Sequence, residues 1–275
     1  YVTFFYHALG GKTSIAGSGP ATQALYGAAD EPTGLFIEKQ FTRSGATSIY
    51  LTYHGAKVNG FDITIPEDGI VTGTWDVMAA VEDSDTTATG VPGGTTLVSP
   101  DSDNPLTSLK LSSTGGFHGY VQIDGSDFTT IQSGRITLTN NAQRVGVISS
   151  NQSYAIEFGR REITGEVQIV LIDATHYEKF IDNDDISLRF RFDADLTPSG
   201  GSTPNSYIEF YFPKVRWGGT GGRAPTPTID DPGPLSLTLP FQALRAEDVT
   251  TVTGDVVDTD IVINLKATSI SDLNF

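Results

Sequence analysis

The chain has 275 residues, of which 38% are hydrophobic, so it can bury a sizeable core in one large or two medium domains. Acidic residues outnumber Lys and Arg by 33 to 17, and the net charge of -16 argues against tight wrapping of nucleic acid or anionic lipid through basic contacts. Cysteine is absent, which excludes disulfides, thiolate metal sites and a cysteine nucleophile. No apolar run approaches the roughly 20 residues that span a bilayer, so we expect no membrane contact.

The first 41 residues predict a helix, a loop and a strand. Residues 1–11 place Phe4, Phe5, Ala8 and Leu9 on one helical face, and Gly10-Gly11 can end the helix. Residues 12–33 are small, polar and rich in glycine, which indicates a surface loop. Residues 34–41, GLFIEKQF, then predict a short strand.

A strand, loop, strand pattern occurs twice. The first copy spans residues 49–83, with a polar crossover, NGFDITIPED, at 59–68; the second spans 207–248, with a crossover rich in Gly and Pro. Matching Glu82-Asp83 to Glu247-Asp248 also pairs Lys57-Val58 with Lys214-Val215. We infer that one unit has been used twice.

Alternating residues predict further strands between and after these copies. In the first copy Val71, Trp75 and Val77 fall on one face and Thr72, Thr74 and Asp76 on the other. Residues 153–173 alternate in the same way, with Ile163, Val167, Ile169 and Leu171 opposite Thr164, Glu166 and Gln168. Strands are also predicted at 120–125, 134–141, 185–192 and 260–267, and a short helix at 174–182.

The order of these elements predicts a domain division. Residues 1–83 form a first domain, residues 84–117 a polar connection, residues 118–248 a second and more complete domain, and residues 249–275 an extension with one strand. A polar stretch as long as the connection is usually functional or disordered. Because the first domain is shorter than the second and the chain begins at Tyr1, we expect roughly 60 further residues upstream, by analogy with the second copy.

No motif in the sequence carries catalytic or metal chemistry. GGTGGR at 218–223 lacks the Lys-Ser/Thr ending of a phosphate loop, and His7, His54, His118 and His176 have no partner at metal-ligand spacing. The acidic segments 101–106 and 180–186 lack the spacing of a helical calcium loop, so solvated loops explain them better than cation sites. Glu82-Asp83 and Glu247-Asp248 suit turn chemistry at strand ends, and the NQS triplet at 151–153 is a common chance match for glycosylation. We therefore predict no enzyme activity, no cofactor and no metal.

The segments GLFIEKQF, YLTYHGAKVNGFDITIPEDGIVTGTWDVMA, VQIDG, SGRITLTNN and REITGEVQIVLID, in this order, resemble the major tail tube proteins of long-tailed bacteriophages, in particular the larger type with a duplicated tube domain. The resemblance covers most of the chain as a pattern, without a single diagnostic motif. It implies a mainly β fold, with two tandem β-sandwich or barrel domains and short flanking helices. It further implies that inner strands of neighbouring subunits share a closed 24-stranded ring barrel, which would satisfy their exposed edges.

The resemblance also implies a function and partners. The protein would polymerise into stacked rings that form the tail tube, the conduit for genome ejection, with three chains per ring favoured over six because each chain carries two units. Its partners would be itself, tail proteins such as the tape measure and the terminator, and DNA in transit; it would be a virion component assembled in the host cytoplasm. The alternative is a β-sandwich adhesin or carbohydrate-binding module, although the aromatic residues lie mostly within strand patterns rather than on loops. The tube of a contractile injection system is a third possibility of similar fold.

Two residue sets follow from this hypothesis. Polar residues on one face of the inner strands would line the lumen: Thr72, Thr74, Asp76, Thr164, Glu166, Gln168, Glu209, Ser236, Thr238 and Gln242. Apolar residues on the other face would form the subunit core: Val71, Trp75, Val77, Ile163, Val167, Ile169, Leu235, Leu237, Leu239 and Phe241. The lumen set contains no Lys or Arg, which suits a conduit because every basic contact with a phosphate would retain DNA.

Overall fold

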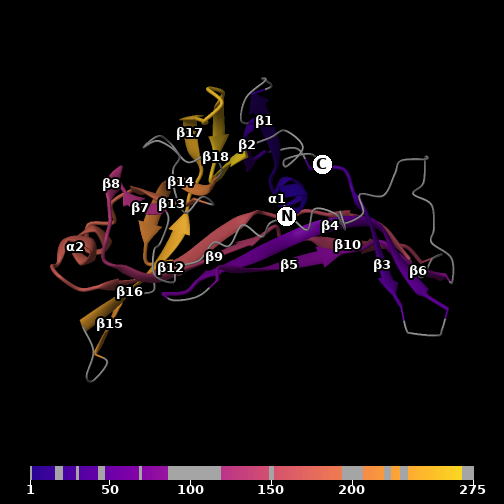
Figure 1. The fold of residues 1–275 in the computed structure, drawn as a ribbon, viewed down its shortest axis with the longest axis horizontal. Helices are drawn as coiled ribbons and strands as arrows, with labels where there is room; N and C mark the ends of the chain where they lie inside the picture. Colours follow the sequence, from indigo (N-terminus) through magenta and orange to yellow (C-terminus); the bar gives the residue numbers. More distant parts are fainter. Residues whose placement is uncertain are drawn as a thin grey trace.

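A computed structural model describes residues 2–15, 21–28, 31–42, 47–67, 70–85, 119–148, 152–193, 207–219, 224–229 and 235–267. The fold of these residues is mainly β (Figure 1). Their helices are α1 (Val2–Leu9) and α2 (Thr175–Ile181). Their strands are β1 (Gly10–Ile15), β2 (Ala21–Gly27), β3 (Leu35–Phe41), β4 (Ile49–Ile65), β5 (Thr72–Met78), β6 (Val81–Asp85), β7 (Gly119–Ile123), β8 (Ser126–Asp127), β9 (Ile131–Thr139), β10 (Gln143–Gly146), β11 (Ser153–Glu157), β12 (Glu162–Val170), β13 (Ile186–Asp193), β14 (Tyr207–Trp217), β15 (Thr226–Ile229), β16 (Leu235–Ala243), β17 (Ala246–Thr250), β18 (Val256–Thr259) and β19 (Val262–Ala267).

Fifteen of these strands form one antiparallel sheet that follows the order β1-β2-β19-β14-β16-β12-β9-β4-β3. β5 and β6 add to β4, β15 adds to β16, and β13 joins β14 to β7. The hairpins β10–β11 and β17–β18 are separate two-stranded sheets. Along the long axis of the molecule, α2 and β15 lie at one end and β3, β6 and β10 at the other (Figure 1). The sheet is not closed into a barrel.

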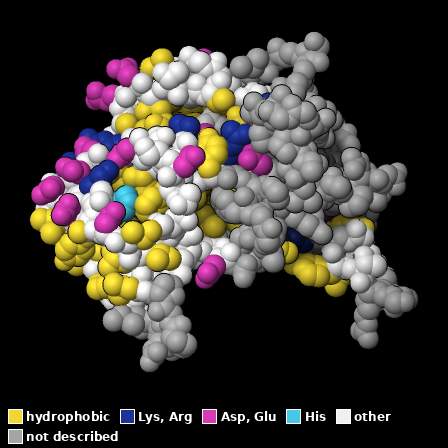
Figure 2. Space-filling view, turned by 60° about the vertical axis from the view of Figure 1, so that its left-hand side comes forward, with side chains coloured by type: hydrophobic (Ala, Val, Ile, Leu, Met, Phe, Trp, Pro, Cys, Tyr) yellow, Lys and Arg dark blue, Asp and Glu magenta, His cyan; other side chains and the backbone are white. Residues whose placement is uncertain are grey.

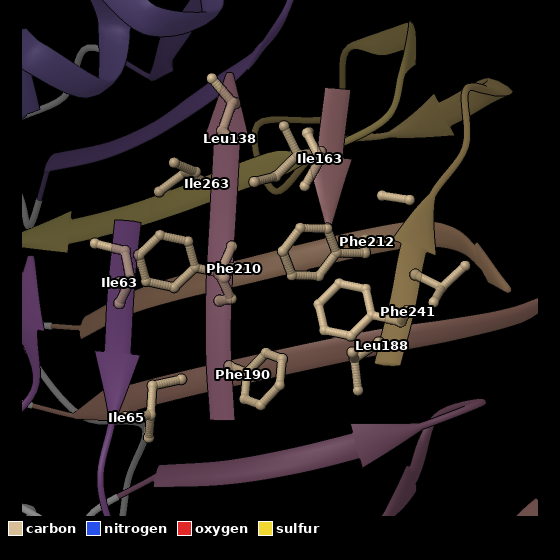
Figure 3. Packing of buried hydrophobic residues seen from close by; sticks show 14 of the residues in the cluster. Ile63, Ile65, Leu138, Ile163, Leu188, Phe190, Phe210, Phe212, Phe241 and Ile263 are labelled. Carbon is tan, nitrogen blue, oxygen red and sulfur yellow. The ribbon is translucent and has the colours of Figure 1, made fainter. Parts of the chain in front are cut away.

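The core lies where β13, β14 and β19 cross over β4, β9, β12 and β16 (Figure 3). Phe190, Phe210 and Phe212 come from the first group of strands, and all three are almost completely buried. They meet side chains such as Leu138 and Phe241 from the second group, which are equally buried. Aromatic residues therefore fill the space between the two layers, and each such ring buries a large apolar area.

The predicted N-terminal helix is confirmed. α1 spans Val2–Leu9, and Gly10 has a φ of 88°, a left-handed conformation that glycine adopts without strain and that commonly ends a helix. Phe5 faces the core, where its ring packs edge-on against Phe61, Trp75 and Phe210. The helix thus closes the core over β4 and β5.

Two predicted loops are wrong. Residues 12–33 contain the hairpin β1–β2, and Ala24 and Leu25 on β2 are fully buried because β2 pairs with β19. The predicted crossover at 59–68 is largely a continuation of β4, which runs to Ile65. Its apolar residues Phe61, Ile63 and Ile65 alternate and are buried, so the period of two that marks a half-buried strand was present in the sequence.

The other predicted elements are confirmed. The strands expected at 34–41, 120–125, 134–141, 185–192 and 260–267 correspond to β3, β7, β9, β13 and β19, and the helix at 174–182 corresponds to α2. The segment 153–173 forms β11 and β12. Two features were not predicted: the hairpin β17–β18, which begins at Ala246 and continues into the C-terminal extension, and the strand β15 within the crossover rich in Gly and Pro. The connection lies outside the described residues from position 86 onward.

The two predicted domains contribute to one sheet and to one core. β4, from the first segment, pairs with β9, from the second, and β2 pairs with β19. The main core cluster contains buried residues of both segments, such as Ile63 and Leu138. The division at residues 83 and 118 therefore remains a prediction about sequence repetition, since the main core draws buried residues from both segments.

Candidate functional site

One layer of the fold presents a continuous polar face. It is formed by β5, β4, β9, β12, β16 and β15, which pair in this order. The antiparallel registers align side chains across the strands: Thr74, Asp62, Thr137, Thr164 and Gln242 are directly opposite one another in turn. Since neighbours in a register project to the same side of a sheet, the alternation of each strand becomes a property of the whole layer.

Val170 and Pro240 lie on this side as well, but most of its side chains are polar. We define the polar face by the polar residues of the six strands on this side: Asp62, Thr64, Thr72, Thr74, Asp76, Ser133, Arg135, Thr137, Thr139, Glu162, Thr164, Glu166, Gln168, Thr226, Thr228, Ser236, Thr238 and Gln242. Residues of the opposite side, such as Ile136, Val167 and Leu239, are fully buried in the core. The layer is thus wet on one side and apolar on the other.

Hydroxyl and amide groups link the strands of the polar face. The Ser133 hydroxyl donates to Gln168 Oε1 at 3.2 Å, and the Gln168 amide donates in turn to Ser236 Oγ at 3.2 Å. The Ser236 hydroxyl then donates to the carbonyl oxygen of Thr228 at 3.4 Å. This chain of bonds runs from β9 through β12 and β16 to β15, so much of the hydrogen-bonding capacity there is used within the face.

Arg135 is the only basic residue of the polar face, and carboxylates flank it on both sides. Its Nε donates to Asp62 Oδ2 at 2.8 Å, and its Nη2 lies 2.7 Å from the same oxygen. The Thr137 hydroxyl also donates to this oxygen, at 2.8 Å. Glu166 is directly opposite Arg135 in the pairing of β9 with β12. Partial burial would raise the pKa of Asp62, but the hydrogen bonds from Arg135 and Thr137 outweigh it and hold that pKa below its ordinary value.

The polar face is therefore acidic overall. Asp62, Asp76, Glu162 and Glu166 oppose the one arginine, whose pKa is raised by the hydrogen bond and the charge of Asp62. Arg216, next to the face at Gln242, is bound to Asp185 through its Nε at 2.5 Å. Neither guanidinium is free to bind an anion without losing a carboxylate partner.

Nine of the ten residues predicted to line a lumen belong to the polar face. Thr72, Thr74 and Asp76 are exposed, and Thr164, Glu166, Gln168, Thr238 and Gln242 are half-buried. Ser236 has the right orientation but is only 2% exposed. Glu209 does not belong to the face: it lies on β14 in the other layer, 5% exposed, where it accepts hydrogen bonds from the Tyr120 hydroxyl and the Asn264 amide.

Most of the predicted core residues are buried. Ile163, Val167, Ile169, Leu237, Leu239 and Phe241 are fully buried, and Val71, Trp75 and Val77 are half-buried against the core. Leu235 is different, because it stands at the start of β16 and is 39% exposed. Asp62, Ser133, Arg135 and Thr137 were not predicted to line a lumen, although Arg135 and Thr137 alternate with the buried Ile136 and Leu138.

The described histidines and acidic residues have identifiable structural environments. Within that part of the chain no group of three or more His, Asp and Glu residues is arranged to hold a metal ion. His7 is buried beside the Tyr6 ring, and His176 is half-buried against the rings of Phe128 and Trp217; burial lowers the pKa of both. Asp185, from the acidic segment 180–186, binds Lys214 and Arg216. His118 and the segments 101–106 and 220–223 lie outside the described residues.

A comparison with protein families identifies the family of this chain. The model of a family described as phage tail tube protein matches residues 2–243. The chain belongs to this family. No curated protein matches the chain.

As a phage tail tube protein, the chain is a structural component of the virion rather than an enzyme. Membership also implies that it assembles with copies of itself into a tube and contacts other tail proteins. The described helices are all too short to cross a membrane. The tail tube function agrees with the first hypothesis from the sequence, and neither the family nor the described part of the chain supports the adhesin alternative.

Proposed function

We propose that the polar face lines the lumen of the tail tube and that three chains form each ring, in the manner of a siphovirus tube protein with a duplicated domain. The ring is a closed 24-stranded barrel, and DNA passes through it during genome ejection. The observation that carries this proposal is the polar face itself, which is continuous over six strands and has the main core on its other side.

The charge of the face supports its role as a conduit. A lumen must let DNA pass without holding it, and each free basic group would add affinity by releasing counterions from the phosphates. The polar face carries four carboxylates, and its one arginine is bound to Asp62. The face therefore repels a phosphate backbone while its hydroxyl and amide groups keep it wetted.

Matching strand pairs support the duplication. In the first unit Val58 is opposite Val77 and Phe61 is opposite Trp75, on β4 and β5. In the second unit Val215 is opposite Ala243 and Trp217 is opposite Phe241, on β14 and β16. A register shift between Val58 and Gly60 accounts for the one extra residue in the first unit. Both units thus place an aromatic pair close to a pair that contains a buried valine, two positions away on β5, β14 and β16 and three positions away on β4.

Two such units per chain favour three chains per ring. Six units complete the ring of the single-domain members that the sequence resembles, and a closed ring leaves no strand edge unpaired. In the isolated subunit β5 and β15 are the outer edges of the polar-face layer. Closing the ring gives both edges a partner.

A symmetry-resolved cross-section of assembled tubes tests this proposal. We expect three copies per ring with pseudo-sixfold symmetry, and we expect Thr74, Asp62, Thr137 and Thr164 to face the central channel. Six copies per ring, each contributing one unit, would show that the repeat has been misinterpreted. Density for the polar face on the outer wall would refute the assignment of the lumen.

A further inference from the structure

Exposed apolar side chains gather at the α2 end of the molecule. Ile172 is 73% exposed, Ile181 64%, Tyr177 40% and Leu235 39%. The backbone amide of Leu171 donates to the carbonyl oxygen of Leu235, so the end of β12 and the start of β16 are adjacent. Figure 2 shows apolar side chains grouped on this side of the molecule, with acidic side chains beside them. We name Ile172, Tyr177, Ile181 and Leu235 the α2-end patch.

A second apolar group lies on the hairpin β10–β11. Ile148 is fully exposed, Tyr154 is 77% exposed, and Val145 and Val147 are each 40% exposed. The hairpin pairs with no other strand of the described chain. Hydrogen bonds to the backbone of residues 79 and 80 attach the hairpin to the rest of the chain. Ser153 N donates to Ala80 O at 3.3 Å, and the Arg144 guanidinium donates to Ala79 O. We name Val145, Val147, Ile148 and Tyr154 the hairpin patch.

These patches are unusual for a surface in contact with water. Single exposed apolar residues are normal, but grouped ones mark interaction sites. A two-stranded hairpin is only marginally stable in water unless a further strand or surface covers it. A partner that covers the hairpin β10–β11 would therefore stabilise it.

The two patches lie at opposite ends of the same strands. β9 leads into the hairpin and β12 leads out of it, and β12 then runs toward Ile172 and α2 (Figure 1). Between the patches, alternate side chains of these strands belong to the polar face and the others to the core. Strands in a closed barrel tilt by about 35–45° from its axis. If β9 and β12 line the lumen, their two ends therefore face the two rims of the ring.

We propose that the hairpin patch of one copy docks on the α2-end patch of a second copy in the adjacent ring. This rests on the proposed function, because the rims exist only if β9 and β12 line the lumen. The contact joins two different surfaces, and such a heterologous contact repeats without closing. It therefore extends the assembly along the tube, whereas strand pairing closes each ring.

Charge favours this head-to-tail contact over a contact between two α2 ends. Asp173, Glu178, Asp182 and Asp184 are exposed around α2, and the nearby Lys179 is bound to Asp124. Two α2 ends placed together would bring these carboxylates face to face, which is repulsive. The hairpin carries one basic and one acidic residue, Arg144 and Glu157, so it can approach the acidic end without this cost.

The absence of cysteine allows a direct test by cross-linking. Ile148→Cys and Ile181→Cys are introduced together, tubes are assembled and treated with a short bis-maleimide, and the products are separated under denaturing conditions. We expect a ladder of covalent multimers, because each copy is linked to one copy above and one below. Each single-cysteine variant is the control and should give at most traces of dimer.

Two outcomes of this experiment would overturn the proposal. One is an efficient dimer from Ile148→Cys or Ile181→Cys alone, which would show that like ends meet. The other is the absence of multimers from the double variant in tubes that microscopy shows to be intact. The symmetry of the ring is read separately from a cross-section, so an error in the number of chains per ring would be recognised independently.

Polar substitutions provide a second measurement. Ile172→Ser combined with Ile181→Ser should leave the unfolding midpoint of the subunit unchanged, because both side chains are exposed. We expect the concentration needed for tube growth to rise roughly tenfold or more, with isolated rings and short stacks accumulating. Val256→Ser is the matched control, since Val256 is 60% exposed on the other hairpin, β17–β18. Tubes of normal length and normal critical concentration from the double serine variant would refute the contact.

Discussion

Replacing Asp62 by Asn tests how the lumen tolerates an arginine. The substitution keeps the size of the side chain but removes the charge that balances Arg135. Arg135 Nε and Nη2 lie 2.8 and 2.7 Å from Asp62 Oδ2 in the native protein, and the Thr137 hydroxyl donates to the same oxygen. In the variant Arg135 keeps only the opposite Glu166 as an acidic neighbour, and its guanidinium can turn toward a passing phosphate.

Asp62→Asn should cause only a small loss of stability, and its gain in DNA affinity should come from Arg135. The side chains of Asp62 and Arg135 are 26% and 55% exposed, and ion pairs this open contribute about 0.2–1 kcal/mol. With the hydrogen bond from Thr137 included, Asp62→Asn should lower the free energy of unfolding by about 1–2 kcal/mol. Each arginine that then engages a phosphate should steepen the salt dependence of DNA binding by about 0.9 in the slope of log K against log salt.

The assay measures binding of short duplex DNA to assembled tubes over a series of salt concentrations, with microscopy to confirm that tubes form. Asp76→Asn is the matched control, because it removes one negative charge from the same face without releasing a cation; the Asp76 carboxylate accepts a hydrogen bond from the Asn59 amide. Adding Arg135→Gln to Asp62→Asn should return binding to the native level. If Asp76→Asn increases binding as much as Asp62→Asn, the general charge of the face, and not a masked arginine, controls DNA retention.

Trp75→Ala should lower the free energy of unfolding of the monomer by about 2–4 kcal/mol, because Trp75 packs against the rings of Phe4, Phe5 and Phe61; unchanged monomer stability would instead place Trp75 at a subunit interface. Gly165→Ala should destabilise by about 1–3 kcal/mol or more, since its Cβ would lie 2.2 Å from the Arg135 carbonyl oxygen, whereas Gly134→Ala, with its nearest neighbour at 3.5 Å, should be tolerated in the same denaturant titration. Hydrogen bonds from Arg216 and Lys214 lower the pKa of Asp185, so their stabilisation is present above the ordinary carboxyl pKa and is lost as the pH falls through the lowered one. Asp185→Asn should therefore flatten the acid limb of the unfolding midpoint plotted against pH, and an unchanged limb would contradict the assignment. Deleting most of residues 86–116 should leave folded subunits that polymerise poorly, and normal tubes from the deletion would exclude a contact role for that segment.

Local patterns predicted the elements whose side chains face a core on one side. The alternation of Ile163, Val167 and Ile169 identified β12, and the same rule applied to Phe61, Ile63 and Ile65 would have extended β4 through the supposed crossover. The helix at the N-terminus was predicted because its apolar face and its terminal glycine agree. Each of these signals involves residues that are close together in the sequence, so a single sequence is enough to predict the element.

The parts that were missed depend on contacts between distant segments. β1 and β2 contain many small or polar residues; β2 pairs with the distant β19 and β1 pairs with β2, and no local pattern reports the pairing with β19. The pairing of β4 with β9 likewise brings Asp62 within reach of Arg135. The ion pair of the polar face therefore could not be predicted from the residues of either strand alone. Glu209 alternates correctly but lies on a strand of the other layer, a distinction that only the order of strands in the sheet can make.

The pairing of β2 with β19 has a consequence for when a subunit becomes competent to assemble. Residues 21–27 lie beside residues 262–267 in the folded sheet, so the ribosome must make some 240 residues before the N-terminal hairpin finds its partner. Contacts of such long separation form late and slowly. Until then Leu25 has no place in the core, and the layer that supports the polar face is incomplete. A growing chain therefore cannot enter a tube early, and polymerisation begins from subunits whose last strand has already been added.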